Sequence, residues 1–431
     1  MDGGGYILVS GRWDNTVAIV DLKQAPLPAN DGTPNAIVSR VRVTPDINID
    51  GERMPASGQP VNLAVPRAGR FAYVVNHSGR ATPAAAAAFQ HGHPGLIAVL
   101  DLAAALDPAN DGTLNAIADF IPTGMAGPVG IALTPDERFV LVTSAEAAER
   151  EDGGREIAVI DTAARTVVRK IPLGVRGNGA SDPQPSPHAG PHPSFGHFPD
   201  PNGIAVSKQG YVFTANGGTG DVSVIDLKRA LAGEPRAEIA RVPVETGPFG
   251  LAVSPDGKLL AAASRESARS GVEGRTISLI DIGRAATGAA DAERARVAVG
   301  SDDPRVATRP FAVAFTRDGK HVVATCFRSN TVSLIDVVAA LAGHPAEIAR
   351  LALSAPDGKP SRPRGVVITP DGRYAAITGG AKSGPGSSVL FLVDVATFKP
   401  AGCVTGLGNE SYFLDVLPST ALATFKLPAK D

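Results

Sequence analysis

A short phrase of apolar residues ending in Asp recurs seven times along the chain, and it constrains the fold more than any other feature of the sequence. Each copy has three or four apolar or small residues, then Asp, and usually another apolar residue, as in VSVIDL and VSLIDV. Successive copies are spaced from 55 residues (281 to 336) to 80 residues (21 to 101) in a chain of 431. The copies end at Asp21, Asp101, Asp161, Asp226, Asp281, Asp336 and Asp394. Such a period indicates a repeat architecture rather than a series of unrelated domains.

A second phrase precedes most copies and supplies the turns. It begins with Pro, passes a small residue and ends in a turn of the Pro-Asp-Gly type, as in PFGLAVSPDG and PRGVVITPDG. In such turns Pro fixes φ and Gly permits positive φ. Strand-like text follows, so each unit reads as four successive strands. Four-stranded sheets repeated seven times bury both faces when they stack radially. We therefore predict an all-β fold, a seven-bladed β-propeller of four-stranded antiparallel blades.

The two ends of the chain are predicted to share one blade. The first Asp phrase, at Asp21, lacks a Pro-led strand before it, and the segment SYFLDVLPS (411–419) reads as the missing strand. Blade 1 would then combine residues of about 6–45 with 411–419, which removes an open sheet edge. The whole chain, 1–431, is interpreted as one propeller domain with loop insertions at 76–95 and 174–200. Small residues recur at the third position of the Pro-led strands, where inner strands crowd together: Gly130, Gly203, Gly250, Ala312 and Gly365.

Composition narrows the partners of such a fold. The chain carries 41 basic and 43 acidic residues and no long block of one sign, which argues against a nucleic-acid partner. No run of about 20 apolar residues is present, so no membrane span is expected. Two cysteines exclude a disulfide scaffold and a four-thiolate zinc site. No phosphate-binding loop motif occurs, so we expect no nucleotide cofactor. The protein is also expected to be a monomer.

The blade text resembles the YVTN repeat of bacterial propellers, in which YVTN followed by TVSVID recurs. The matching stretches here are YVVNH, YVFTANGGTGDVSVID and ATCFRSNTVSLID. The resemblance covers nearly the whole chain, and the family spans lactonase-like enzymes and surface-layer proteins. It implies the propeller fold and an exported, periplasmic or extracellular protein. No catalytic residue of the lactonase-like members can be matched to this chain. The opening residues MDGGGYILVSGRW lack the basic segment and apolar core of an export signal.

Two long loops gather six of the eight histidines. The loop 76–95 lies within blade 2, the loop 174–200 joins blade 3 to blade 4, and both are predicted to lie on the same face of the propeller. Neutral imidazole is the commonest transition-metal ligand, so these loops predict a zinc, copper or iron site. The alternative is a covering loop whose histidines only make hydrogen bonds. The candidate ligands are His77, His91, His93, His188, His192 and His197.

A weaker cation signal lies in the segment TPDINIDGERMPASGQP (44–60). Asp46, Asn48 and Asp50 followed by Gly match the first half of a calcium loop, in which alternate oxygens and a turn wrap the ion. The twelfth position of that pattern is Ser57 rather than Glu, so a standard EF-hand is excluded. A partial calcium site and a polar turn remain as alternatives.

Polar residues at the corners between the second and third strands of the blades form a third candidate site. They would line one mouth of the axial channel and bind an anionic ligand, or else form a solvated rim. The candidates are Arg12, Glu146, Arg265, Arg328 and Lys382, with Asp14 and Glu266 beside them.

These observations leave the activity open, because a fold of this kind hosts many functions. The interpretation we favour is an exported propeller that binds a metal ion, a small molecule or a protein on the face carrying the His-rich loops. One alternative is a metal-dependent oxidoreductase or hydrolase that uses the same site. A second is a metal-free lactonase-like hydrolase that uses Arg, Glu and His residues at the channel mouth. A third is a scaffold without metal that binds a protein or a glycan.

Overall fold

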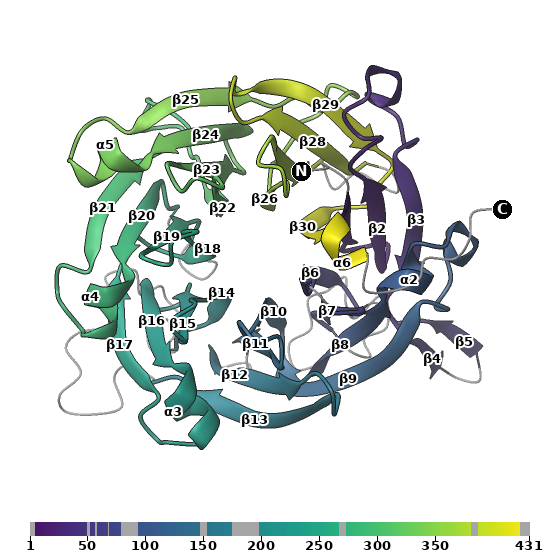
Figure 1. Cartoon of the computed structure of the whole chain (residues 1–431), viewed down its shortest axis with the longest axis horizontal. Coiled ribbons are helices and arrows are strands. Elements are labelled where there is room, and N and C mark those ends of the chain that lie inside the picture. Colours follow the sequence, from purple (N-terminus) through teal and green to yellow (C-terminus); the bar gives the residue numbers. More distant parts are fainter. Residues whose placement is uncertain are drawn as a thin grey trace. The chain divides into compact units, whose positions relative to one another are not determined.

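The computed structural model describes residues 5–49, 52–56, 58–67, 69–78, 94–146, 153–174, 198–266, 273–380 and 387–422. Their strands form seven four-stranded sheets, and the predicted seven-bladed β-propeller is confirmed (Figure 1). Contacts divide the chain into two compact units, Met1–Gly124 with Ser354–Asp431, and Met125–Leu353. The first strand of each blade contacts the first strands of the neighbouring blades in its unit, and we call it the inner strand.

The first unit holds three blades. They are blade 1, with β30 (Ser411–Pro418), β1 (Gly5–Gly11), β2 (Thr16–Asp21) and β3 (Ile37–Arg42); blade 2, with β6 (Pro60–Ala64), β7 (Phe71–Asn76), β8 (Pro94–Asp101) and β9 (Ile117–Ala126); and blade 7, with β26 (Val366–Ile368), β27 (Tyr374–Gly379), β28 (Val389–Asp394) and β29 (Lys399–Thr405). A separate hairpin pairs β4 (Asp46–Ile49) with β5 (Glu52–Pro55).

The second unit holds four blades. They are blade 3, with β10 (Pro128–Leu133), β11 (Phe139–Glu146), β12 (Gly153–Asp161) and β13 (Thr166–Pro172); blade 4, with β14 (Pro201–Val206), β15 (Tyr211–Asn216), β16 (Asp221–Asp226) and β17 (Glu238–Pro243); blade 5, with β18 (Pro248–Val253), β19 (Leu259–Ser264), β20 (Thr276–Asp281) and β21 (Glu293–Ala298); and blade 6, with β22 (Pro310–Phe315), β23 (His321–Cys326), β24 (Thr331–Asp336) and β25 (Glu347–Ala352).

The described helices are short. They are η1 (Pro28–Asn30), α2 (Leu102–Ala105), η2 (Pro108–Asn110), α3 (Leu227–Ala232), α4 (Ile282–Ala286), α5 (Val337–Leu341) and α6 (Ser419–Leu422). None of the helices in the described part of the chain has the length and apolar character needed to cross a membrane.

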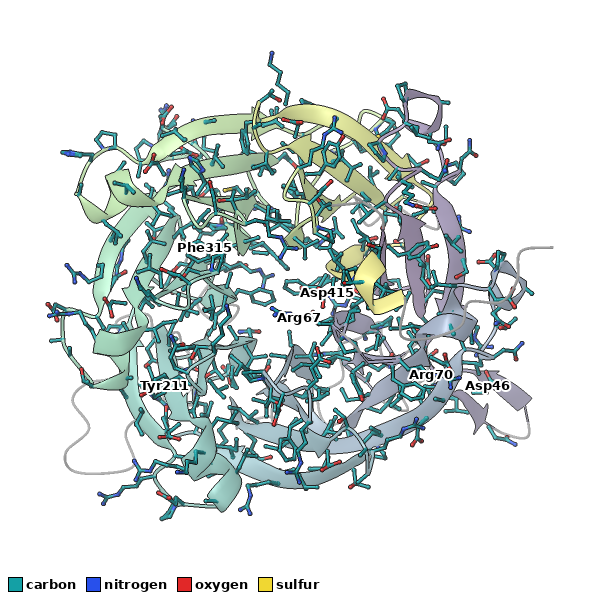
Figure 2. All side chains as sticks on the ribbon, viewed as in Figure 1. Asp46, Arg67, Arg70, Tyr211, Phe315 and Asp415 are labelled. Atoms are coloured by element: carbon teal, nitrogen blue, oxygen red, sulfur yellow. The ribbon has the colours of Figure 1, made fainter. Side chains whose placement is uncertain are left out.

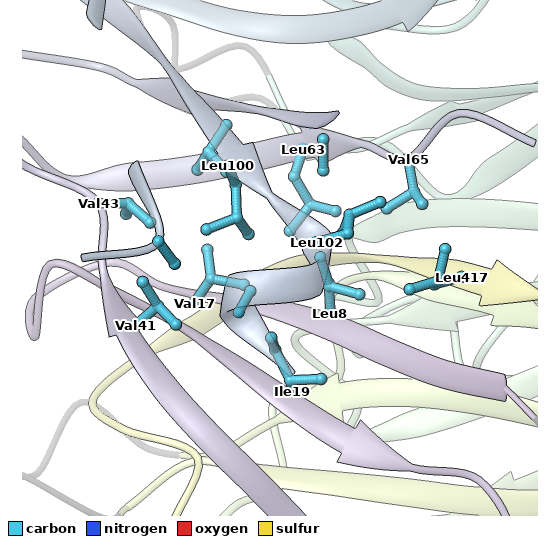
Figure 3. Packing of buried hydrophobic residues seen from close by; sticks show 14 of the residues in the cluster. Leu8, Val17, Ile19, Val41, Val43, Leu63, Val65, Leu100, Leu102 and Leu417 are labelled. Atoms are coloured by element: carbon cyan, nitrogen blue, oxygen red, sulfur yellow. The ribbon is translucent and has the colours of Figure 1, made fainter. Parts of the chain in front are cut away.

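Blade 1 is built from both ends of the chain, as the sequence predicts. The C-terminal strand β30 pairs antiparallel with β1, with Tyr6 opposite Leu417 and Val9 opposite Leu414. The inner edge of β1 is thereby covered by a segment about 400 residues away in sequence. Buried leucine and isoleucine side chains of this blade pack against those of blade 2, with Leu8, Ile19 and Leu100 fully buried (Figure 3). Each such burial contributes about 1.5–3 kcal/mol to folding.

The recurring Asp has a structural role at the end of each third strand. In blades 4, 5 and 6 its carboxylate accepts a hydrogen bond from the first turn of the following helix, for example from the backbone nitrogen of Ala339 to Asp336 at 2.8 Å. In the tighter turns of blades 3 and 7 it accepts from Ala164 and Thr397 backbone nitrogens, each at 2.9 Å. Asp is a preferred residue for this position because its oxygen satisfies backbone donors that lack partners.

The Asn-Asp-Gly-Thr turns of blades 1 and 2 join neighbouring blades at their outer strands. Asp31 accepts a hydrogen bond from the backbone nitrogen of Cys403 on β29 at 2.8 Å, and Thr33 forms a parallel bridge with Val404. In the same way, Asp111 accepts from the backbone nitrogen of Arg40 on β3 at 2.6 Å. The repeated turn therefore forms hydrogen bonds to the outer strand of the preceding blade.

The small residues at the third inner-strand position are required by close approach between blades. A Cβ atom added to Gly203 would lie 2.0 Å from the carbonyl oxygen of Phe249 in the next blade. The same atom on Gly130 would lie 2.1 Å from the carbonyl oxygen of Asn202, and on Gly250 2.5 Å from that of Phe311. These distances leave no room for a side chain, so crowding of the inner strands explains the glycines.

Candidate functional site

The residue directly before the Pro, or in blade 1 the Ser, that opens each inner-strand phrase has a positive φ. Two of the seven are Gly127 and Gly247, which adopt this conformation without a side-chain clash. The other five carry long or polar side chains, although an L-residue there costs roughly 1–2 kcal/mol. They are Gln59 (50°), Asp200 (47°), Arg309 (51°), Arg362 (41°) and Glu410 (58°). Polar side chains at a strained backbone position make these residues candidates for a functional site, although Asp200 has a structural contact, accepting from the backbone nitrogen of Gly154 at 2.8 Å.

Arg309 is the centre of a charged cluster in the second unit. Its Nη2 donates to Oε1 of Glu266 at 2.5 Å and to Oε1 of Glu273 at 2.8 Å. These two glutamates follow β19 and precede β20, and they face each other across an antiparallel bridge. Arg328, after β23, places its Nε 3.7 Å from the same oxygen of Glu273. We call Arg265, Glu266, Glu273, Arg309 and Arg328 the Arg309 cluster.

Three phenylalanines support the arginines of this cluster. The Arg265 guanidinium carbon lies 4.8 Å from the ring centre of Phe249 and 5.1 Å from that of Phe311. Those two rings are 4.6 Å apart, and Arg309 lies 5.8 Å from the ring of Phe327. A guanidinium held against aromatic faces keeps its plane and its charge at a fixed position.

The Arg309 cluster contains buried polar atoms without a partner. The side chains of Arg309, Glu266 and Glu273 are only 15%, 15% and 21% exposed. Among the described residues, no hydrogen-bond partner is found for Arg265 Nε, Arg309 Nε or Glu273 Oε2, although each is buried. Buried polar atoms are almost always satisfied by protein, water or ligand. Two guanidinium donors and one carboxylate oxygen are thus available to a bound molecule. The carboxylate can accept a proton, and the donors can stabilise a developing oxyanion.

A second charged cluster lies in the first unit, in the turn between β1 and β2. Arg12 donates from Nε and Nη2 to Oε1 of Gln59, at 3.1 and 2.9 Å. Trp13 Nε1 donates to the carboxylate of Glu410, which also accepts from Arg364 Nη2 at 3.0 Å. Burial raises the pKa of the neighbouring Asp14.

The structure brings together some of the predicted mouth residues. Arg265 and Arg328, with Glu266, lie in the Arg309 cluster, and Arg12 lies in the cluster of the first unit. Glu146 is the last residue of β11, and its side chain lies outside the description; Lys382 lies outside the described residues.

Sequence reasoning missed six residues of these clusters: Trp13, Gln59, Glu273, Arg309, Arg364 and Glu410. A signal for Arg309 was present, because a charged residue stands directly before the Pro of an inner-strand phrase.

The predicted metal site falls almost entirely outside the described residues. His91, His93, His188, His192 and His197 all lie there. His77 is described at the end of β7, where its backbone nitrogen donates to the carbonyl oxygen of Gln59 at 3.2 Å. The described ranges contain no group of three or more His, Cys, Asp or Glu arranged to hold a metal ion. The metal site therefore stays a prediction.

The predicted calcium segment begins as a β-hairpin. Asp46 and Asn48 lie on β4, and Asp46 is labelled in Figure 2. The carboxylate of Asp46 pairs with Arg42. Asp50 lies outside the described residues. One of the three candidate ligands is therefore already engaged by a guanidinium, and the calcium site stays a prediction.

Comparison with known proteins identifies the fold. No protein-family model matches the chain, and no curated protein sequence matches it. Among solved structures, the periplasmic gluconolactonase PpgL of Pseudomonas aeruginosa is similar, with a TM-score of 0.64 and 15% identity over 96% of this chain and 99% of that chain. A candidate 6-phosphogluconolactonase from Bacteroides uniformis is similar with a TM-score of 0.61 and 13% identity, over 96% of this chain and 100% of that one.

The fold also occurs with other chemistry. Hydrazine synthase of Kuenenia stuttgartiensis is similar with a TM-score of 0.54 and 17% identity, over 85% of this chain and 86% of that chain. At such identities the likeness extends to the fold and not to the activity. The chain is thus a seven-bladed β-propeller whose structural neighbours include lactonase propellers.

Proposed function

We propose that this propeller is a metal-free hydrolase that opens lactones at the Arg309 cluster. The observation that carries the proposal is that Glu273 Oε2, Arg265 Nε and Arg309 Nε, all buried in the Arg309 cluster, have no hydrogen-bond partner among the described residues. A base and oxyanion donors in one site are the two requirements of ester hydrolysis. The resemblance to the YVTN propellers and the likeness to PpgL support the same class of reaction.

The reaction follows from these groups. Glu273 accepts a proton from a water molecule, and the water oxygen attacks the carbonyl carbon of the lactone. The negative charge that develops on the carbonyl oxygen is stabilised by the Nε donors of Arg265 and Arg309. The ring C–O bond then breaks, and the leaving alkoxide takes back the proton held by Glu273. One lactone and one water yield one hydroxy acid.

The charge of the cluster favours this chemistry. The Arg309 cluster holds three arginines and two glutamates, which leaves one positive charge in excess. That excess stabilises both the oxyanion and the carboxylate of the ring-opened acid. Arg309 also holds Oε1 of Glu273, so the carboxylate presents its other oxygen, Oε2, in a fixed direction.

The test is hydrolysis of glucono-δ-lactone, measured as proton release in a pH-stat after removal of metals with a chelator. The substitution Glu273→Gln keeps the shape and removes the base, so we expect kcat to fall about 10²–10⁴-fold. Glu293→Gln is the matched control, because Glu293 has the same 21% exposure and also pairs with an arginine, Arg296. Hydrolysis that survives Glu273→Gln unchanged would refute the assignment of the base.

The setting of the protein belongs to the same proposal. An exported location, periplasmic or extracellular, is implied by the resemblance to YVTN propellers and matches the description of PpgL as periplasmic. Fractionation of the native host, with the protein detected by antibody, tests the location.

A further inference from the structure

The only tryptophan of the chain lies in the charged cluster of the first unit. Trp13 stands in the turn between β1 and β2, and its indole nitrogen donates to one oxygen of the Glu410 carboxylate. The other oxygen of Glu410 accepts from Arg364 Nη2 at 3.0 Å. We call Arg12, Trp13, Arg364, Glu410 and Tyr412 the Trp13 cluster. Its geometry does not depend on the Arg309 cluster, so the inference drawn from it stands apart from the proposed hydrolysis.

Arg364 anchors the frame of the Trp13 cluster. Arg364 is only 2% exposed, and its Nη1 donates to the carbonyl oxygens of Gly380 at 3.2 Å and Ser411 at 3.4 Å. Burial lowers the pKa of Arg364 below its ordinary value, and the charge of Glu410 opposes that change. A buried guanidinium with this many acceptors holds Glu410 in one position.

Arg12 lies between two aromatic rings. Its guanidinium carbon is 5.1 Å from the ring centre of Trp13 and 5.3 Å from that of Tyr412 on β30. Two of its nitrogens donate to the same oxygen of Gln59, a residue only 2% exposed. The cation is therefore fixed in place by stacking and by hydrogen bonds, which is the arrangement of a recognition site rather than of a solvated surface arginine.

Polar atoms around the frame lack partners. Among the described residues, none is found for Asn409 Oδ1 or Ser411 Oγ, which flank Glu410, or for Ser361 Oγ, which adjoins Arg362. All three atoms are buried, and buried hydroxyl and amide groups rarely remain unsatisfied. They provide hydrogen-bonding capacity for a molecule that carries several hydroxyl groups.

The charges of the site favour an anion. Arg12 and Arg364 both lie over the ring of Tyr412, at 5.3 and 5.7 Å, and Arg362 also acts electrostatically on Arg364. Two carboxylates belong to the same surroundings, Glu410 beside Arg364 and Asp14, which Arg40 influences. Four guanidiniums and two carboxylates leave two positive charges in excess, which attract an anionic ligand. Asn409 Oδ1 can only accept a hydrogen bond, so the ligand that fits the site also carries hydroxyl donors.

We infer that the Trp13 cluster is a binding site for a sugar acid, a polyhydroxylated molecule with one carboxylate. The carboxylate pairs with the arginines, and the hydroxyl groups satisfy the buried oxygen atoms of Asn409, Ser411 and Ser361. The two aromatic rings bound the site and keep Arg12 oriented toward the ligand.

Trp13 makes the inference directly measurable. Because it is the sole tryptophan, intrinsic fluorescence at the indole band reports on this site alone. Gluconate is titrated against the full chain, with glucose as the neutral analogue and inorganic phosphate as the competing anion, each up to about 10 mM. We expect gluconate to change the tryptophan fluorescence in a saturable way, and glucose and phosphate to bind at least about tenfold more weakly. Calorimetry should give the same order of affinities.

Variants assign the binding to these residues. Arg12→Gln and Arg362→Gln each remove one charge and are expected to weaken gluconate binding at least about tenfold. Arg373→Gln is the control, because Arg373 also stacks on a tyrosine, Tyr374, but is 67% exposed elsewhere in the same unit. The inference would be overturned if gluconate produced no fluorescence change and no heat. It would also be overturned if glucose bound as tightly as gluconate, if phosphate bound more tightly, or if Arg373→Gln weakened gluconate binding as much as the other two variants. Hydrolysis at the Arg309 cluster would be unaffected by that outcome.

Discussion

Replacing Arg309 with methionine should destabilise the protein, because two carboxylates share this one cation. Arg309 Nη2 bonds Glu266 at 2.5 Å and Glu273 at 2.8 Å, and all three side chains are at most 21% exposed. Removing one partner of a buried ion pair typically costs about 3–5 kcal/mol. Residual exposure and the nearby Arg328, 3.7 Å from Glu273, reduce this. We expect the free energy of unfolding to fall by about 2–3 kcal/mol near neutral pH.

Urea unfolding followed by circular dichroism at about pH 7.5 measures this loss of stability. Methionine is also an L-residue, so the strain of the positive φ at this position is the same in both proteins. Arg305→Met is the control, because Arg305 pairs with Asp303 but is 88% exposed, and its loss should produce no measurable change. A loss of stability in Arg309→Met no larger than that in the control would refute the reasoning.

Three further outcomes follow from the fold and from the sequence. Gly203→Ala would place a Cβ atom 2.0 Å from the Phe249 carbonyl oxygen, so the free energy of unfolding should fall by about 3 kcal/mol. The control Gly283→Ala, within a helix, should not destabilise the protein. Urea unfolding midpoints compare the two variants, and equal effects would contradict the crowding argument. Burial raises the pKa of the Cys326 thiol to about 12, and burial together with a smaller effect of Asp31 raises that of Cys403 to about 11. Thiol reagents near pH 8 should therefore label neither cysteine until the protein is unfolded. Rapid labelling of the native protein would be inconsistent with this expectation. If the His-rich loops hold a transition metal, untagged protein should contain about one equivalent that is lost in the double variant His188→Ala, His192→Ala, and less than about a tenth of an equivalent after reconstitution would reject that site.

The fold was predictable because its signals are local and repeated. Each recurring Asp caps the turn or helix after a third strand, so Asp is required once per blade. In blades 3, 4, 5 and 7 the inner-strand glycine lies against a carbonyl oxygen of the next blade. Closure of blade 1 by β30 follows from counting strands, because one inner strand is missing near the N-terminus.

The candidate site was only partly predictable, for the opposite reason. The position before each inner strand holds Gln, Gly, Asp, Gly, Arg, Arg and Glu in turn, so no repeat marks it. Arg309 meets Glu266 and Glu273 across two blades, and that pairing depends on how a loop of blade 5 approaches the start of blade 6. Sequence reasoning identified Arg265 and Arg328 as mouth residues. The charged residue before Pro310 was visible in the sequence, but nothing there showed that Arg309 pairs with Glu266 and Glu273.

The most direct test of the proposed function is the rate of glucono-δ-lactone opening by the metal-stripped protein, compared with the spontaneous rate. We predict that the protein catalyses the hydrolysis, that a chelator does not reduce the rate, and that Glu273→Gln lowers the rate to about 1% of the original or less. A metal-stripped protein that opens the lactone no faster than buffer alone, or activity that returns only when a metal is added, would contradict the proposal.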